Sequence, residues 1–135
     1  VGKPLLGICL GMQLICSRSF EFGETRGLGL IEADVIEMQP KEGLKVPHMG
    51  WNNLCSIQDS KLLADINDNN TFYFVHSFCV KSSKENVLAF TDHTEKFASV
   101  IGKGTVFGAQ FHPEKSAKAG LTFLSNFARL VNDSK

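Results

Sequence analysis

The pentapeptide GICLG at residues 7–11 is the feature that most constrains what this chain can fold into. The apolar residues 4–6 before it are typical of a short buried strand, and residues 12–16 after it are typical of a helix. A strand that turns sharply into a helix, with a nucleophilic side chain at the turn, is a nucleophile elbow. Glycines on both sides would let the backbone reverse tightly and let the helix pack close. The block therefore predicts an α/β fold with Cys9 at a strand-to-helix turn.

Cys9 is a candidate nucleophile at that turn. Amide N–H groups at a helix N-terminus stabilise a thiolate and face an oxyanion that forms on an attacked carbonyl. The alternative is a buried structural cysteine, and the pentapeptide alone does not decide between the two. On the following helix we expect Met12, Ile15 and Cys16 on the buried side, and Gln13 on the side of Cys9.

A second block, QFHPEKS at residues 110–116, supplies the partners that a cysteine nucleophile requires. Such a nucleophile needs a base, and the base needs an acceptor that orients it. His112 and Glu114 are two residues apart with Pro113 between them, so the carboxylate can turn back to the imidazole and fix its tautomer. A surface or capping histidine is the alternative for His112 alone, but the two blocks together are far more specific.

Together, GICLGMQ at 7–13 and QFHPEKS at 110–116 closely resemble the nucleophile and His/Glu blocks of the class I glutamine amidotransferases. Three further blocks resemble the glutaminase subunits of imidazole glycerol phosphate synthases: GLGL at 27–30, VPHMGWN at 46–52 and FYFVHSF at 72–78. The likeness runs from Pro4 to Val131. The family carries about one more α/β stretch upstream, with a Gly-rich oxyanion strand, that residues 1–135 do not contain.

The resemblance implies a flavodoxin-like mixed sheet with flanking helices and a catalytic triad. Its expected members are Cys9 as nucleophile, His112 as base and Glu114 as orienting acceptor. For substrate binding it implies the backbone N–H of Leu10, the side chains of Gln13 and Glu21, and the backbone of His76, Ser77 and Phe78. A surface carboxylate is the alternative for Glu21, and a solvated helix residue for Gln13. No metal or other cofactor is expected.

The resemblance also implies a partner, a cyclase subunit with a (β/α)8 barrel that receives ammonia in a heterodimer. Met49, Trp51 and Tyr73 are expected at the face that contacts it, and a buried Trp51 is the alternative. The implied products are glutamate, imidazole glycerol phosphate and an aminoimidazole carboxamide ribotide. Other interpretations remain: an amidotransferase that feeds another acceptor, a cysteine protease or γ-glutamyl hydrolase, and a catalytically silent fragment.

Composition narrows the classes further. The 135 residues are 43% hydrophobic and predict one domain with a substantial core, residues 1–135. Lys+Arg and Asp+Glu both number 14, so the basic excess typical of nucleic-acid or anionic-membrane surfaces is lacking. The four cysteines have no C-x-x-C spacing, which suits reduced cytoplasmic thiols better than a zinc site or disulfides. The first residue is Val1 rather than Met, which is typical of a fragment or a processed chain.

Hydrophobic patterning predicts the remaining elements. Strands are expected at residues 33–38, 71–80, 87–91, 97–101 and 105–111, with a hairpin turn at 102–104. Residues 23–31 and 39–44 are expected to be loops, and residues 60–66 one or two helical turns. Ser116 is expected to cap a last helix with the apolar stripe Leu121, Leu124, Phe127, Ala128 and Val131, and with Lys118 and Arg129 on its wetter side.

Overall fold

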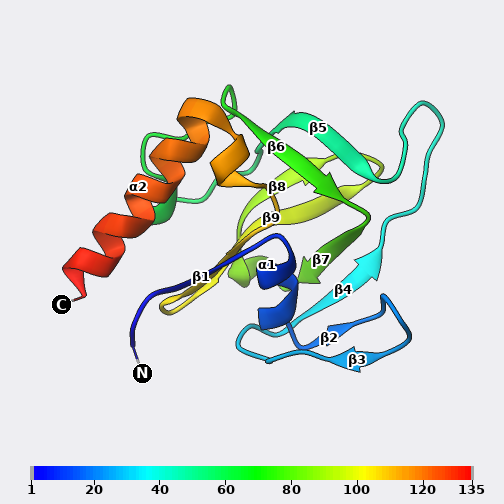
Figure 1. Cartoon of the computed structure of the whole chain (residues 1–135), viewed down its shortest axis with the longest axis horizontal. Helices are drawn as coiled ribbons and strands as arrows, with labels where there is room; N and C mark the ends of the chain where they lie inside the picture. The colour runs from blue at the N-terminus through cyan, green and yellow to red at the C-terminus, as the bar shows by residue number, and fades with distance from the viewer. Residues whose placement is uncertain (1, 135) are drawn as a thin grey trace.

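The structure is a computed structural model that describes residues 2–134. The described residues form two α-helices and ten strands, and eight of the strands make up a curled main sheet. Both chain ends lie on the same side of the molecule (Figure 1). The α-helices are α1 (Leu10–Ile15) and α2 (Ala117–Asp133), and the 3-10 turns are η1 (Lys61–Leu63), η2 (Lys84–Asn86) and η3 (Pro113–Lys115). The strands are β1 (Leu5–Ile8), β2 (Arg18–Ser19), β3 (Thr25–Arg26), β4 (Ala33–Glu37), β5 (His48–Asn53), β6 (Thr71–His76), β7 (Phe78–Ser82), β8 (Val87–Asp92), β9 (Lys96–Lys103) and β10 (Val106–Ala109).

The main sheet has the order β1-β10-β9-β7-β4-β2-β3, and β8 pairs with β9 outside this path. It is mixed: β1 runs parallel to β10 and β2 parallel to β4, while the other pairs are antiparallel. Strands β5 and β6 form a separate antiparallel pair, which we call the β5–β6 ribbon. The expected mixed sheet with flanking helices is confirmed.

Two cores lie on opposite faces of the main sheet because successive strand residues point to opposite sides. On β9, for example, Phe97 and Val100 belong to one core, and Ala98 and Ile101 to the other. The first core includes Phe123 of α2, and Phe72 and Phe74 of β6. The second contains Met12, Ile15 and Cys16, all buried as expected from the α1 pattern. Each α-helix therefore covers one face of the sheet.

The predicted strand at residues 71–80 was wrong in one respect that matters for the site. It is two strands, β6 and β7, interrupted at Ser77. β6 pairs with β5 in the ribbon, whereas β7 pairs with β4 and β9 in the main sheet. One continuous strand cannot join both sheets, so the chain bends between them. The alternating apolar pattern runs on across this bend and gives no sign of it.

Other boundaries differ less. The strands at 33–38, 87–91, 97–101 and 105–111 are present as β4, β8, β9 and β10, and η1 replaces the helical turns at 60–66. The hairpin turn comes later than expected, because β9 continues through Lys103 and Gly104 carries the positive φ of 62°. β2, β3 and β5 were not predicted, since their polar residues and glycine gave no strand pattern.

The apolar stripe expected on α2 was partly wrong. Leu121 is 65% exposed and Ala128 is also exposed, whereas Phe123 and Asn126 are buried. The buried face is shifted by about one residue, or roughly a quarter of a turn, from the predicted stripe, and Phe127 of that stripe still packs against the first core. Asn126 fits this face because its amide donates to the carbonyls of Leu62 and Ala64, at 2.9 and 2.8 Å. Lys118 and Arg129 are exposed as expected. Neither α2 nor any other helix of residues 2–134 combines the length and apolarity that crossing a membrane requires.

Two buried histidines connect the β5–β6 ribbon to the main sheet. His76 Nδ1 lies 2.8 Å from the carbonyl oxygen of Phe78, so this nitrogen carries the hydrogen and donates. His76 Nε2 then accepts from His48 Nδ1 at 2.9 Å, and His48 Nε2 accepts from the Asn52 amide at 3.1 Å. Burial lowers the pKa of His48 to about 3 and that of His76 to about 4, and neighbouring histidines add to both shifts. Both imidazoles are neutral in the folded protein.

These neutral histidines predict a loss of stability at mildly acidic pH. The unfolded chain takes up protons below pH about 6.5, whereas the folded chain holds both imidazoles neutral until about pH 4 and 3. The free energy of unfolding therefore decreases as the pH is lowered, by about 3 kcal/mol from pH 6.5 to 5 for the pair. Urea unfolding across this window measures the slope, and His48→Gln should make it shallower. An equal slope in that variant would contradict the assignment.

Candidate active site

The chain reverses direction at Cys9, between β1 and α1, as a nucleophile elbow requires. Cys9 has φ 54° and ψ −104°, a backbone conformation that is uncommon for any residue with a Cβ. Gly7 is required for the close packing of α1 on β1, because a Cβ there would lie 2.5 Å from the carbonyl oxygen of Gly11. A Cβ on Gly11 would meet nothing within 4 Å, so the expected packing role for that second glycine was wrong.

Parallel pairing of β1 with β10 brings the two predicted blocks together. Ile8 is opposite Ala109, and the backbone N–H of Cys9 donates to the carbonyl of Ala109 at 2.7 Å. His112 follows three residues later, at the entrance to η3. Residues about one hundred positions apart in the sequence therefore lie at one end of the same strand pair (Figure 1).

His112 and Glu114 contact each other directly. His112 Nδ1 lies 3.0 Å from Glu114 Oε2, and its N–H donates to that carboxylate. This bond fixes the imidazole tautomer and leaves Nε2 as the basic nitrogen. The backbone N–H of His112 donates to the carbonyl of Tyr73 at 2.9 Å, which holds the turn against β6.

Ser116 holds this turn rather than capping α2 as expected. It occupies the N-cap position, but its side chain makes no capping hydrogen bond. Its hydroxyl instead donates to the carbonyl of His112 at 2.6 Å and accepts from the backbone N–H of Tyr73 at 2.9 Å. The 3-10 turn η3 precedes the helix, so the hydroxyl faces the turn and β6.

A pocket of about 310 Å³ opens beside Cys9. It is lined by residues from three stretches of the chain: Cys9, Leu10, Gln13, Glu21, Val75, His76, Ser77 and Phe78. Seven of these eight are residues that the sequence analysis proposed for the nucleophile or for substrate binding. His76 takes part through its position only, since both of its ring nitrogens are bonded within the protein. The bend at Ser77 forms one wall.

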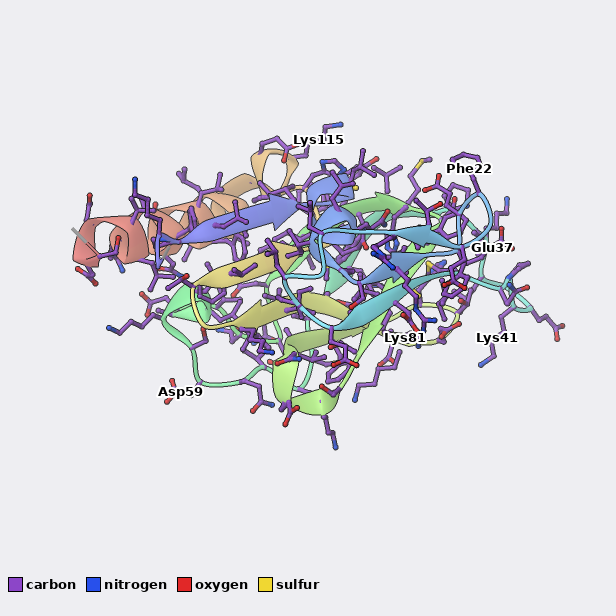
Figure 2. The ribbon with its side chains drawn as sticks, turned by 90° about the horizontal axis from the view of Figure 1, so that it is seen from below. Phe22, Glu37, Lys41, Asp59, Lys81 and Lys115 are labelled. Carbon is purple, nitrogen blue, oxygen red and sulfur yellow. The ribbon has the colours of Figure 1, made fainter. Side chains whose placement is uncertain are left out.

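The groups around Cys9 shift the pKa of its thiol in opposite directions. Burial raises the pKa of its thiol above the ordinary value, and the Glu114 carboxylate adds to this. The backbone N–H of Leu10, the amide of Gln110 and the charge of Lys115 lower it. Lys115 projects from the same edge of the molecule as the exposed Phe22 (Figure 2). The expected stabilisation by the helix N-terminus is present, but burial outweighs it.

Gln110 is a site residue that the sequence analysis missed. Its side chain is fully buried, and its Nε2 donates to Cys9 Sγ at 3.7 Å. Its Oε1 accepts from Gln13 Nε2 at 3.4 Å, and Gln13 Nε2 also lies 3.4 Å from the carbonyl oxygen of Phe78. The residue stands in the QFHPEKS block, but we assigned it to a strand because the residues around it are apolar.

The residues expected at a partner surface lie on the β5–β6 ribbon. Met49 is 62% exposed and Trp51 is 54% exposed, so neither belongs to a core. Trp51 stands opposite Tyr73 across the ribbon, with ring centroids 5.9 Å apart in an edge-to-face arrangement. The same ribbon lines the pocket through Val75 and His76.

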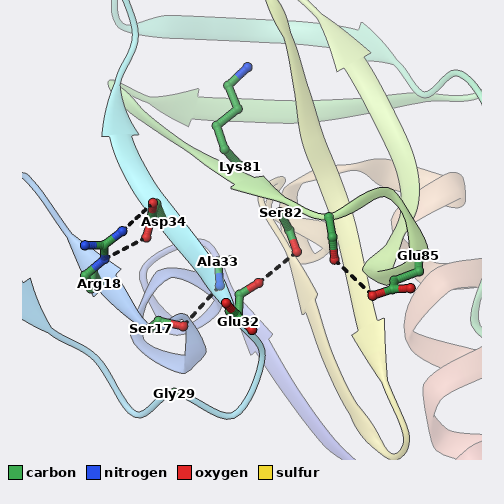
Figure 3. Close-up of a pocket in the computed structure, with 10 residues that line it drawn as sticks. Ser17, Arg18, Gly29, Glu32, Ala33, Asp34, Lys81, Ser82 and Glu85 are labelled. Carbon is green, nitrogen blue, oxygen red and sulfur yellow. Dashed lines mark hydrogen bonds and ion pairs between the residues drawn. The ribbon is translucent and has the colours of Figure 1, made fainter.

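A larger hollow of about 850 Å³ lies away from Cys9, between β2, β4 and β7 (Figure 3). Two of its charged residues, Arg18 and Asp34, pair in a bidentate contact at 3.0 Å, and Lys81 pairs with Glu95 outside the lining. Ser82 donates to the carbonyl of Glu32 and Ser83 to the Glu85 carboxylate. None of the cysteines lines this hollow, so the candidate active site is the smaller pocket beside Cys9.

Comparison with curated proteins gives relatives over nearly the whole chain. The imidazole glycerol phosphate synthase subunit HisH 1 of Campylobacter jejuni is 49% identical over 128 residues, which are 95% of this chain and 64% of that protein. The HisH subunit of Methanosarcina acetivorans is 50% identical over 131 residues, 96% of this chain and 64% of that protein. The HisH subunit of Lacticaseibacillus casei is 48% identical over 132 residues, which are 98% of this chain and 63% of that protein. The chain thus spans about 63–64% of the length of these relatives.

Solved structures support the fold. A candidate GMP synthase component of Thermoplasma acidophilum is similar with a TM-score of 0.69 at 20% identity, over 98% of this chain and 59% of that one. A glutamine amidotransferase of Thermotoga maritima is similar with a TM-score of 0.58 at 19% identity, over 96% of this chain and 49% of that one. The family model of class-I glutamine amidotransferases matches residues 1–130. With nearly the whole chain matched, this protein belongs to the class-I glutamine amidotransferase family.

Proposed function

We propose that the pocket at Cys9 hydrolyses glutamine to glutamate and ammonia, in the cytoplasm and within a single amidotransferase domain. The observation that carries this proposal is the pairing of β1 with β10, which sets the half-buried Cys9 next to the turn that holds His112 and Glu114. Nucleophile, base and orienting carboxylate are the components of a catalytic triad. Membership of the family supports the choice of glutamine as substrate.

In the proposed reaction the Cys9 thiolate attacks the side-chain carboxamide carbon of glutamine. The proton of the thiol passes to His112 Nε2 and then to the departing ammonia, so that a γ-glutamyl thioester remains. Water then attacks the thioester, with the same imidazole as general base, and glutamate leaves. Glu114 holds the imidazole in the required tautomer. The backbone N–H of Leu10 is the oxyanion donor that this chain supplies.

Substrate binding is assigned to the other residues of the pocket. Gln13 and Glu21 line the pocket together with the bend at Ser77. We assign the Glu21 carboxylate to the α-amino group of glutamine and the Gln13 amide to polar groups of the substrate. Residues 76–78 also line the pocket, and their backbone offers further hydrogen-bonding groups.

We further propose that the ammonia passes to a cyclase subunit bound at the β5–β6 ribbon, in a heterodimer that makes imidazole glycerol phosphate. Free ammonia would become unreactive ammonium in neutral water, so direct transfer has a chemical advantage. The ribbon is suited to this because it exposes Met49 and Trp51 on the surface and also lines the pocket. The relatives named HisH, at 48–50% identity, support this choice of partner over another ammonia acceptor.

The nucleophile is tested by Cys9→Ala in the intact protein with its partner. Glutamate release should fall by at least about 10³-fold, because removing one triad member leaves only binding and oxyanion contacts. Synthesis from added ammonia should continue. Cys55→Ala is the matched control, since it removes a half-buried thiol outside the pocket and should retain glutaminase activity. Glutamine hydrolysis by Cys9→Ala would disprove the triad.

Substrate binding is tested by Gln13→Ala. Loss of its proposed hydrogen bonds to glutamine should raise the KM for glutamine by about tenfold. Alkylation of Cys9 by a small thiol reagent should change much less. Gln58→Ala, which removes an exposed amide, is the control. If Cys9 labelling fell as far as glutamine turnover, Gln13 would act on the thiol and not on the substrate.

The partner surface is tested by Trp51→Ala. Truncating an aromatic anchor at an interface commonly costs about 2 kcal/mol or more of binding free energy. We therefore expect weaker partner binding, or more glutamine consumed per product formed, with little change in the melting temperature of the free protein. Leu121→Ala removes another exposed apolar side chain, on α2, and serves as control. A large drop in melting temperature with unchanged affinity and stoichiometry would refute the assignment.

A further inference from the structure

We propose that Gln110 is a positioning residue for this site, whose amide holds the sulfur of Cys9 and the amide of Gln13 at a fixed spacing. Cys9 and Gln13 are then both positioned toward the same bound glutamine. The assignment rests on the proposed function for its catalytic meaning, but the contacts themselves belong to the structure.

Gln110 is held rigidly. It follows β10 directly, its backbone N–H donates to the carbonyl of Ser99 at 2.9 Å, and its side chain is fully buried. A buried amide is costly unless its polar atoms are hydrogen-bonded. Its partners here are the two pocket residues, Cys9 Sγ at 3.7 Å and Gln13 Nε2 at 3.4 Å.

The two contacts require one orientation of the Gln110 amide. Gln13 Nε2 only donates, so the atom of Gln110 that faces it is the carbonyl Oε1. Nε2 of Gln110 must then face the sulfur, where a thiolate is an acceptor only. The whole chain of bonds runs from the Phe78 carbonyl through Gln13 and Gln110 to Cys9. Rotation of the Gln110 amide would break both of its contacts.

The contact with sulfur favours the reactive form of Cys9. As a thiol, Cys9 donates weakly to the carbonyl of Val75 at 4.0 Å, and that oxygen repels a thiolate. The N–H of Gln110 instead favours the thiolate, because its hydrogen bond to sulfur is stronger when the sulfur is charged. The other charged or titratable groups around Cys9 are Glu114 and Lys115 of η3, His112 before it, and Glu21 and His76 on the pocket walls.

The test measures the pH dependence of Cys9 alkylation by iodoacetamide in the intact protein, with the Cys9 peptide followed by mass spectrometry. Gln110→Met removes both contacts in a side chain of similar shape, and Gln110→Asn withdraws the amide by one methylene. Both variants should raise the alkylation midpoint by about one pH unit. Both should also lower kcat/KM for glutamine by about tenfold. Gln13→Ala leaves the N–H on sulfur and should keep the midpoint.

Asn126→Leu is the matched control for a merely structural role. It also removes a buried amide, one that donates to the carbonyls of Leu62 and Ala64 beneath α2. We expect a lower melting temperature with the wild-type alkylation midpoint. Gln110→Asn carries the test if Gln110→Met does not fold.

The outcomes separate the two proposals. Unshifted midpoints in folded Gln110 variants, with an active wild-type glutaminase, would overturn the role of Gln110 and leave the function standing. If the Gln110 variants shift the midpoint but the wild-type protein does not hydrolyse glutamine, the proposed function is overturned and the contact with sulfur is supported. Shifted midpoints together with reduced glutaminase activity support both.

Discussion

The parallel pairing of β1 with β10 is the interaction on which the rest of the structure depends. Four residue pairs, from Leu5 with Val106 to Ile8 with Ala109, fix the register between two distant segments. This register sets the Cys9 amide on the Ala109 carbonyl and leaves the next residues of both segments side by side. A slip by one residue would reverse the faces of β10 and carry Gln110 away from the sulfur.

The site shows how a buried nucleophile can be kept usable. Burial alone favours the neutral thiol, so the thiolate depends on the few groups directed at the sulfur, namely the Leu10 backbone N–H and the Gln110 amide. The same pocket wall is tied through the Phe78 carbonyl to His76, and through His48 to the exposed ribbon. Each of these polar groups is buried with a partner, so the wall has little freedom to rearrange.

Prediction from the sequence succeeded where the signal is local. The elbow, its helix and the His112–Glu114 turn are each encoded within a few residues, by glycine, proline and the spacing of polar groups. Prediction failed where one continuous apolar pattern covers two segments that belong to different sheets. The apolar run at 71–80 fits one strand, yet the chain bends at Ser77 because its halves join different sheets. The stripe of α2 failed because the surface that meets the helix decides which face is buried.

The sequence by itself therefore determined the chemical groups of the candidate site and the class of fold, because nucleophile, base and turn residues are readable from residue types at short spacing. Only the tertiary structure decided which of those groups meet. Gln110 could not be distinguished from a core residue in the sequence, since its two partners, Cys9 and Gln13, are about one hundred residues away. Both ring nitrogens of His76 are bonded within the protein, to His48 across the β5–β6 ribbon and to the carbonyl of Phe78 beyond the bend, and neither contact follows from the alternating apolar pattern. A buried polar side chain is defined by its hydrogen-bond partners, and those come from the packing of distant strands.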